Sequence, residues 1–569
     1  MDKILGFFKH QDQKPEDHHA YIKDHVFKIN ETNDNKEKLK TLKKIRRYLE
    51  LFKDEWTTPK PVKKRMRIKL PSKTKIEYPT DEAEIQRIIK EAYEDGNTIV
   101  RVIGSGHSVP EAIIDVSGIS GKTKIRFLCL EKYHGVEIDH KNHTAIVKAG
   151  THLNRDPKDK NSTVQNSFNY IIDQAGYALP DLGGVAHQTV GGFISTGSAG
   201  GSLIHNVHDS IIKIRIIDGK GIIHDLSIDD ADNSKFLAAG VSLGLLGIIT
   251  KITFKLMKNY YITGNEIIAS VTPLSNDFKV GCPIDLLGDG DKEQNIPSIY
   301  EFFTNSKEYD ADYARIFWWP QDGVNRLTIW RAKPIPAPSN DEKPLSINSY
   351  NEFPVIAGSE IPAQLIASLV MIALNLLSSE NKFYKKIAAY LINLFVPIGI
   401  QEFQDKWYNG LPMDDKVSDT AFPATFSELL FPIAKTSEIV HALNNLYKTG
   451  GEKVIGNFAT EIYTTKKSHF WLSQSYNTDS IRFDIQYFQK NPIGTSRKFF
   501  QQYWDAFYPY NFRCHWGKHI PEGYGKRVRS LYEKYDDWMK VREEMDPKQI
   551  FVIAYWRKHL DIKPLSDVL

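Results

Sequence analysis

The chain has 569 residues, which is too long for a single compact core, so two or three domains are expected. Hydrophobic residues make up 41% and charged residues 25%, fractions that exclude a mainly disordered chain. Lys plus Arg (74) nearly balance Asp plus Glu (70), so no nucleic-acid partner is expected. The cysteines, Cys129, Cys282 and Cys514, are too far apart to predict a disulfide framework or a cysteine zinc site.

The predicted elements follow a basic N-terminal extension, residues 1–69. Lys and Arg crowd residues 36–75, which predicts a solvated, partly helical arm, with a patch for anionic lipid or nucleic acid as the alternative. Thr80 is expected to cap a helix that ends at Gly96. The apolar residues at helical spacing in this helix are Ile85, Ile88, Ile89 and Ala92.

Further strands make residues 70–258 a mixed α+β region. The predicted strands are Thr98–Ile103, 125–130, 144–149, 248–256 and the two arms of a hairpin over 211–226 that turns at Asp218-Gly219. Residues 259–545, with aromatic and Pro-rich stretches and longer helical patterns, are predicted to form a second domain. A C-terminal segment, 546–569, then contains a strand-like run over 550–556.

Two apolar stretches in the second domain raise the question of membrane contact. Residues 361–378 carry no charge, and residues 387–400 follow a basic patch of Lys382, Lys385 and Lys386. We expect a pair of buried helices, with a hairpin that dips into a membrane surface as the alternative and a transmembrane span as the least favoured interpretation. The first ten residues, MDKILGFFKH, do not resemble a secretory signal, so a cytoplasmic location with optional peripheral membrane contact is predicted.

Two glycine-rich segments predict close approach of the backbone to a ligand. The first, Gly104-Ser105-Gly106-His107-Ser108, directly follows a predicted strand, and its unobstructed peptide N–H groups are suited to the oxygens of a diphosphate. The second extends from Leu179 to Ser202 and has too many glycines for an ordinary helix or strand. Neither contains a P-loop, and Val109 interrupts the partial GxGxxG match, so a Rossmann domain is not predicted.

At these residues the sequence resembles the vanillyl-alcohol oxidase family of flavoproteins, which have a PCMH-type FAD-binding domain. The GSGHS loop, the LPDLGG…GG…STG segment and the closing run Gly244–Ile249 carry the resemblance over about 70–258. It implies an α+β fold in which a two-subdomain FAD-binding domain precedes an α+β substrate domain, and the C-terminal segment returns to the first domain. The implied FAD-binding residues are Gly104, Ser105, Gly106, His107, Ser108, Asp181, Gly183, Gly184, Gly191, Gly192, Ser195, Gly197 and Ile249.

The resemblance also implies a covalent flavin. In the family, the histidine at the place of His107 commonly bonds to the flavin 8α-methyl group, and some members add a cysteine link. No cysteine lies between Asp181 and Gly192, so a single histidyl link is predicted.

The rest of the chain resembles the aldonolactone and alditol oxidase branch of this superfamily. His515-Trp516-Gly517-Lys518 matches the HWGK motif, and Thr460–Tyr463 with Trp471–Ser473 resembles the EIR…WLS stretch of alditol oxidases. Residues 546–551 resemble the closing segment of the family. The resemblance implies oxidation of a CH–OH group, with hydride passing to the flavin.

Four residues are the catalytic candidates. Lys518 would stabilise negative charge on reduced flavin, and Glu461 would accept or order the proton of the substrate hydroxyl. His515 would hold its loop or the substrate, with a purely structural role as the alternative. Tyr463 stands where alditol oxidases have arginine, which favours a less polar substrate unless another cation such as Arg315 substitutes for it.

Substrate and electron acceptor are left with alternatives. The substrate is predicted to be a sugar lactone, an alditol or a more lipophilic alcohol. Alignment places Gly183 beside the flavin where a bulkier residue blocks oxygen, so O2 is the expected acceptor, giving H2O2. The alternatives are a membrane-docked dehydrogenase that passes electrons to a quinone or cytochrome, and a flavin-fold protein that has lost catalysis.

Overall fold

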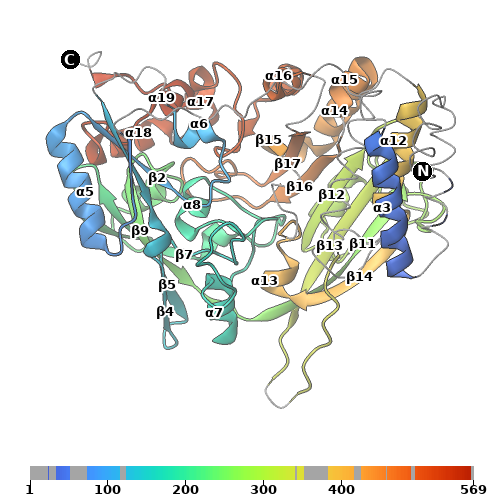
Figure 1. The fold of residues 1–569 in the computed structure, drawn as a ribbon, viewed down its shortest axis with the longest axis horizontal. Coiled ribbons are helices and arrows are strands. Elements are labelled where there is room, and N and C mark those ends of the chain that lie inside the picture. The colour runs from blue at the N-terminus through green and yellow to red at the C-terminus, as the bar shows by residue number, and fades with distance from the viewer. Residues whose placement is uncertain are drawn as a thin grey trace, which may run out of the picture.

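The computed structural model in Figure 1 has two α+β parts side by side, with the C-terminal helices lying above the first. Apart from the single positions Asp24 and Lys28, it describes residues 34–51, 74–115, 123–339, 342–351, 382–415, 424–456, 458–488 and 494–565.

The first part contains two sheets, as expected for a two-subdomain FAD-binding fold. A three-stranded parallel sheet has the order β1-β3-β2, and a five-stranded antiparallel sheet has the order β4-β5-β9-β7-β8. The strands are β1 (Thr74–Glu77), β2 (Thr98–Ile103), β3 (Lys124–Cys129), β4 (Val136–Asp139), β5 (Thr144–Lys148), β7 (Ile211–Asp218), β8 (Ile223–Ser227) and β9 (Gly247–Lys255). The predicted strands of this region are thereby confirmed to within two residues at each end.

Short helices and loops connect these strands. The helices are α5 (Glu82–Asp95), α6 (Pro110–Ile113), α7 (Phe168–Gln174), α8 (Val190–Ser195) and α9 (Ser234–Ala239), and a two-stranded ladder pairs β6 (Tyr177–Ala178) with β10 (Met257–Lys258). The prediction that Thr80 caps the first helix is wrong by one residue. Asp81 is the N-cap, because its carboxylate accepts the N–H of Glu84, whereas the N–H and hydroxyl of Thr80 both donate to the Glu84 carboxylate.

The second part is built on an eight-stranded sheet, which the helical patterns of the sequence did not predict. Its order is β14-β11-β13-β12-β16-β17-β15-β18. The strands are β11 (Tyr260–Ser270), β12 (Tyr313–Trp319), β13 (Arg326–Pro336), β14 (Gly399–Lys406), β15 (Ala424–Pro432), β16 (Thr460–Thr465), β17 (Ser480–Phe488) and β18 (Arg513–Cys514). The helices of this part are α10 (Ile299–Thr304), α12 (Lys382–Phe395), α13 (Trp407–Gly410), α14 (Thr436–Gly450), α15 (Glu452–Ile455) and α16 (Ser496–Phe507).

Helix α12 accounts for most of the second apolar stretch. Ile387, Leu391 and Ile392 are at most 1% exposed, so this half of the predicted helix pair is buried, whereas Ile398 and Ile400 beyond it remain exposed. The first stretch, 361–378, lies outside the described residues. Among the described residues no helix has both the length and the apolar character needed to cross a bilayer. Membrane contact through 361–400 therefore stays a prediction.

The C-terminal segment packs against the first part, as the fold prediction requires. The N–H of Val100 on β2 donates to the carbonyl of Ile550, and the Trp556 indole donates to the carbonyl of Ala112. Helix α19 (Ala554–Leu560) lies in this segment, and α17 (Gly525–Leu531) and α18 (Tyr535–Met545) precede it. The predicted strand over 550–556 is wrong: this apolar run is buried as a turn that leads into α19.

The N-terminal extension contains one described helix, α3 (Asn35–Leu51). Leu42 and Ile45 are fully buried in it, while Lys43 and Lys44 are exposed. The arm is thus partly helical, as predicted, but one face of the helix is packed and not solvated.

Candidate active site

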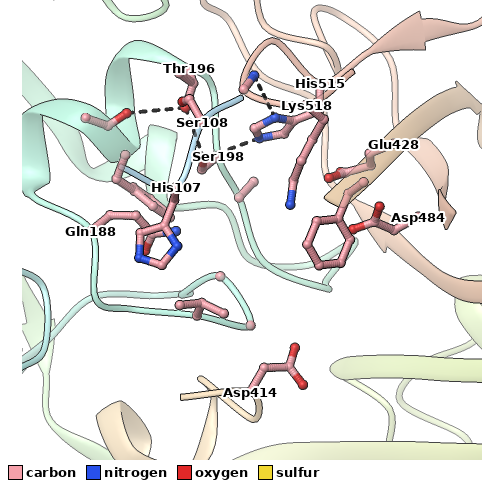
Figure 2. Close-up of a pocket in the computed structure, with 18 of the residues that line it drawn as sticks. His107, Ser108, Gln188, Thr196, Ser198, Asp414, Glu428, Asp484, His515 and Lys518 are labelled. Atoms are coloured by element: carbon pink, nitrogen blue, oxygen red, sulfur yellow. Dashed lines mark hydrogen bonds between the residues drawn. The ribbon is translucent and has the colours of Figure 1, made fainter. Parts of the chain in front are cut away.

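A cavity of about 660 Å³ lies between the two parts of the molecule. One wall comes from the loop after β2, the glycine-rich segment around α8 and the start of β9. The other wall is the face of the eight-stranded sheet, closed at one end by Ile392 and Phe395 of α12 and by Val396, which follows this helix. Figure 2 shows side chains from both walls converging on this space.

The first glycine-rich loop presents free backbone donors to the cavity. Within the described residues, the N–H groups of Ser105, Gly106 and Ser108 find no acceptor in the protein. Gly106 has φ +77°, and a Cβ built on it would meet nothing within 4 Å. The His107 ring is directed into the cavity beside Gln188 and lies 5.9 Å from the ring of His187. This loop therefore has the properties of an anion-binding nest.

Packing explains several glycines of the second segment. A Cβ on Gly191 would come within 2.9 Å of the Ala149 Cβ, and a Cβ on Gly200 would collide with the Asp181 carboxylate. That carboxylate accepts the N–H groups of Leu182 and Gly200, and its burial raises the pKa of Asp181 to about 8. Asp181 thus ties the two ends of the segment together.

Not every predicted cofactor residue faces the cavity. Gly197 is the exception: it packs against Gln474 and lies outside the lining. Ser195 does line the cavity, but its hydroxyl donates to the carbonyl of Gly191 within α8. The other predicted residues all contribute to the first wall: Gly104, Ser105, Gly106, His107, Ser108, Asp181, Gly183, Gly184, Gly191, Gly192 and Ile249.

These features fit the expected flavin dinucleotide. The free N–H groups beside Gly106 would hold the diphosphate, and His107 reaches the cavity where the ring system would lie. None of the three cysteines, all in the described part of the chain, lines the cavity, so none of them is placed to add a cysteinyl link.

The second wall carries an ordered set of polar side chains because strands β12, β16, β17 and β15 are in register. Phe317, Glu461, Asp484 and Glu428 are directly opposite one another in one cross-strand row. Side chains in such a row share one face of the sheet. The register thereby brings three carboxyl groups together, and Figure 2 shows two of them, Asp484 and Glu428, near Lys518.

A second row places two arginines beside Tyr463. Arg315 on β12 and Arg482 on β17 both pair with Tyr463 on β16, and the Arg482 guanidinium lies 4.1 Å from the centre of the Tyr463 ring. The cation that Tyr463 lacks is therefore supplied by neighbouring strands. The sequence predicted Arg315 as a substitute for the missing arginine, but it did not predict Arg482.

Arg482 forms a buried ion pair with Glu428. Its Nε donates to Glu428 Oε1 at 2.7 Å and its Nη2 contacts the same oxygen, while Nη1 donates to the carbonyls of Ala199 and Gly200. Burial alone raises the pKa of Glu428, but the nearby charges, above all that of Arg482, outweigh it and lower the pKa to about 2. Glu428 is therefore a permanent carboxylate.

Glu461 has a weaker partner. Arg315 Nη1 lies 3.5 Å from Glu461 Oε1 but only 2.7 Å from Asp414 Oδ1. Arg315 therefore forms its main ion pair with Asp414 and stabilises the Glu461 carboxylate less. Burial raises the pKa of Glu461 to about 7, against the opposing effect of Arg315. A carboxyl with this pKa can accept or release a proton near neutral pH.

His515 and Lys518 come from the loop after β18. His515 Nδ1 accepts the N–H of Gly517 at 3.0 Å, and its Nε2 lies 3.3 Å from the hydroxyl of Ser198. Burial lowers the pKa of His515 to about 4, so the ring is neutral and holds the loop against the first wall. Lys518 extends from this loop into the cavity, with its Nζ 4.0 Å from the centre of the Phe426 ring (Figure 2).

Glu461, Tyr463, His515 and Lys518 all line the same cavity as the predicted cofactor loops. No motif in the sequence predicted the four further polar residues of the cavity, Arg482, Asp484, Glu428 and Asp414. The first two alternate along β17 in the run SIRFDIQYF, so a strand prediction there would have placed them on one face. Asp414 lies within a turn between two elements and carries no such signal.

Comparison with known proteins agrees with this geometry. Residues 75–227 match the FAD binding domain family, and residues 287–559 match the D-arabinono-1,4-lactone oxidase family. The first match contains both glycine-rich segments of the cavity, and the second contains Arg315, Glu461, Arg482 and Lys518. The chain thus has an FAD-binding domain match followed by a D-arabinono-1,4-lactone oxidase match.

Individual relatives show different coverage. A D-arabinono-1,4-lactone oxidase of Kluyveromyces lactis is 26% identical over 46% of this chain and 41% of its own length. A probable L-gulonolactone oxidase of Arabidopsis thaliana is 23% identical over 86% of this chain and 80% of its own. The matched region thus spans about two fifths of the length of the first curated relatives.

Solved structures share the fold at low sequence identity. Cholesterol oxidase of Brevibacterium sterolicum superposes with a TM-score of 0.60 and 13% identity, covering 85% of this chain and 94% of that chain. A chitooligosaccharide oxidase superposes with a TM-score of 0.53 and 13% identity, covering 86% and 91%. At this identity the similarity shows a shared fold.

Proposed function

We propose that this protein is an FAD-dependent oxidase that converts a CH–OH group of a sugar lactone, an alditol or a related alcohol into a carbonyl, with O2 as the electron acceptor and H2O2 as the product. One observation carries the proposal: a single cavity joins the free N–H groups around Gly106 and the ring of His107 to Lys518 and Glu461 on the other side. A cofactor held on the first wall would face the proton-accepting groups of the second.

The flavin, when bound, accepts a hydride from the substrate carbon. Glu461 takes the proton of the substrate hydroxyl, because its raised pKa suits proton exchange near neutral pH. Lys518 supplies positive charge where the reduced ring becomes negative, and Arg482 and Arg315 orient substrate oxygens beside Tyr463.

The test of activity uses the purified protein with its flavin. D-Arabinono-1,4-lactone, L-gulono-1,4-lactone and xylitol are added without oxygen, and loss of the flavin absorbance is followed. At least one compound should bleach the flavin, and admitting oxygen should restore the colour and release H2O2. A colourless protein, or a flavin that none of the compounds bleaches, would contradict the proposal as stated.

The covalent link has its own test. In the wild-type protein the flavin should stay with the acid precipitate, whereas in His107→Ala it should be released into the supernatant. His187→Ala is the matched control, because its ring is 5.9 Å from that of His107 and is the neighbouring alternative for attachment. Retention of the flavin in His107→Ala, or its release only in His187→Ala, would reject His107 as the attachment site.

A more lipophilic alcohol is the second candidate substrate. Towards β11 the sheet wall of the cavity becomes apolar. Its lining residues there are Ile268, Phe317, Trp319 and Trp330, together with Phe395 of α12. This apolar end could accommodate a hydrocarbon body. If so, 1-octanol should bleach the flavin, and Phe395→Asp should abolish that reaction while leaving any bleaching by xylitol intact.

A further inference from the structure

We infer that Asp484 is a second proton-carrying group of this site: Asp484 and Glu461 face each other across adjacent strands and together retain one proton at neutral pH, and the ionised member accepts the hydroxyl proton of the substrate. The catalytic half of this inference rests on the proposed function. The protonation of Asp484 does not, because it follows from the protein alone.

The geometry concentrates three acids in one row. Asp484 on β17 is directly opposite Glu461 on β16 and Glu428 on β15, and all three are at least 90% buried. Directly opposite residues of this kind have Cβ atoms about 4.5–5.5 Å apart. Three carboxylates at such spacing, away from water, repel one another strongly, so at least one of them retains a proton.

The partners of the three acids decide which of them is neutral. Glu428 is bound by Arg482, and Glu461 has Arg315 at 3.5 Å. Asp484, by contrast, has no hydrogen bond and no ion pair within the part of the chain that the structure describes, and its Oδ1 is fully buried. A buried carboxyl without a partner is most stable in its protonated form.

The surrounding charges leave this conclusion unchanged. Asp484 faces Glu428 on β15, Glu461 on β16, Arg482 on its own strand and Lys518 from the loop after β18. Burial, together with the two neighbouring acids, raises the pKa of Asp484 well above its ordinary value, despite the opposing charge of Lys518. Glu461 is in turn faced by Arg315 and Asp414, which form a pair with each other.

In the reaction, the pair handles one proton. The C–H and O–H bonds of the substrate break, the hydride leaves with both C–H electrons for the bound flavin, and the C=O bond forms. The hydroxyl proton moves to the ionised carboxyl, Glu461. The neutral Asp484 keeps its proton and donates a hydrogen bond to the substrate oxygen or to Glu461. The charge of the pair thus changes from −1 to zero, and a buried dianion is avoided.

The first experiment measures stability against pH in Asp484→Asn and Glu428→Gln. Native Asp484 holds a proton that the unfolded chain releases above its ordinary pKa, so the contribution of Asp484 to stability falls as pH rises from 5 to 8. Asp484→Asn should weaken this fall and leave the melting temperature at pH 8 equal or higher. Glu428→Gln, the matched control in the same row, should lower the melting temperature because Arg482 loses its partner. Equal destabilisation by both variants would overturn the inference.

The second experiment looks for the proton directly. The infrared C=O stretch of protonated carboxyl groups is recorded for the holoprotein at pH 7, and part of this band should be lost in Asp484→Asn but not in Glu428→Gln. Glu266 is another buried acid, and its pKa is raised to about 7, so it also contributes to this infrared band. The variant Glu266→Gln shows how much of the band comes from Glu266. An unchanged band in Asp484→Asn would refute the neutral acid.

The third experiment addresses catalysis, with D-arabinono-1,4-lactone as the probe. The acid limb of the kcat/KM profile should move to higher pH in Asp484→Asn, because an amide stabilises ionised Glu461 less than a carboxylic acid does. An unmoved limb would restrict Asp484 to a structural role and overturn the catalytic half of the inference. If the lactone fails to reduce the flavin, the proposed function fails for that substrate, and the stability and infrared results still decide the protonation of Asp484.

Discussion

Tyr463 shows how one side chain takes its chemistry from its neighbours. By sequence it replaces an arginine and weakens the similarity to alditol oxidases, yet Arg315 and Arg482 stand on either side of it in the sheet. The guanidinium stacked on the Tyr463 ring is held by Glu428, so charge, aromatic ring and counter-charge form one unit. Residue identity at one position is therefore a poor guide to the polarity of this site.

Replacing Arg482 with Met should destabilise the protein by about 3–5 kcal/mol, because Glu428 would remain buried without a partner. Denaturant unfolding at pH 7 measures this. The double variant Arg482→Met/Glu428→Leu is the control, and it should recover most of the loss, since neither charge is then left alone. A double variant no more stable than the single one would show that the arginine acts through its contacts with the Ala199 and Gly200 carbonyls.

The same ion pair makes a prediction about acid stability. The pKa of Glu428 is lowered to about 2 from an ordinary value of 4.5, so its contribution is complete above pH 4.5 and is lost as the pH falls towards 2. The stability difference between wild type and the double variant should therefore shrink over that interval. A difference that stays constant from pH 5 to pH 2.5 would contradict the lowered pKa.

Gly183 has little free space around its Cα. A Cβ there would meet the Phe193 ring at 3.3 Å and the carbonyl oxygen of Val185 at 3.5 Å. If Gly183 keeps a path for oxygen open, Gly183→Ala should slow reoxidation of the reduced flavin by about tenfold, a barrier increase of roughly 1.4 kcal/mol. Stopped-flow mixing with oxygen measures the rate. An unchanged rate, with flavin still bound, would separate this glycine from oxygen access.

At the scale of elements, helix α5 illustrates what local sequence can and cannot locate. Its apolar face, Ile85, Ile88, Ile89 and Ala92, is buried as predicted, and Gly96 ends it with φ +64°. The start was misplaced by one residue because Thr80 and Asp81 are both good N-caps and only the backbone decides between them.

Asp81→Ala should therefore cost about 1 kcal/mol of stability, since the N–H of Glu84 loses its acceptor. Thr80→Ala is the matched control, and it should cost less than about 0.5 kcal/mol because its hydrogen bond to Glu84 is exposed to solvent. Thermal unfolding of the two variants makes the comparison. A larger loss in Thr80→Ala would restore Thr80 as the cap.

At the scale of the whole molecule, the C-terminal segment closes the cofactor side. Trp556 is 2% exposed, lines the cavity and donates its indole N–H to the carbonyl of Ala112. The last part of the chain thus supports elements that lie more than 400 residues earlier, which explains why the C-terminal helices lie above α6 and β2 in Figure 1.

Removing the Trp556 side chain should disturb both stability and cofactor retention. Trp556→Ala is expected to cost about 3–5 kcal/mol and to lower the flavin content of the purified protein. Trp556→Phe keeps most of the ring and should cost only about 1 kcal/mol for the lost hydrogen bond. Absorbance of flavin relative to protein measures the retention. Equal flavin content in Trp556→Ala and wild type would show that the segment acts on the fold alone.

The sequence alone located the candidate cofactor loops that line the cavity, because a nest needs consecutive residues and so leaves its signal in one short motif, GSGHS. It also located Glu461 and Lys518, which line the same cavity, through motifs of the same local kind. Only the tertiary structure decided that Asp484, Glu428 and Arg482 join them, since these residues meet through strand register between segments far apart in the chain. Their charge states follow from burial and partners, which no linear motif records.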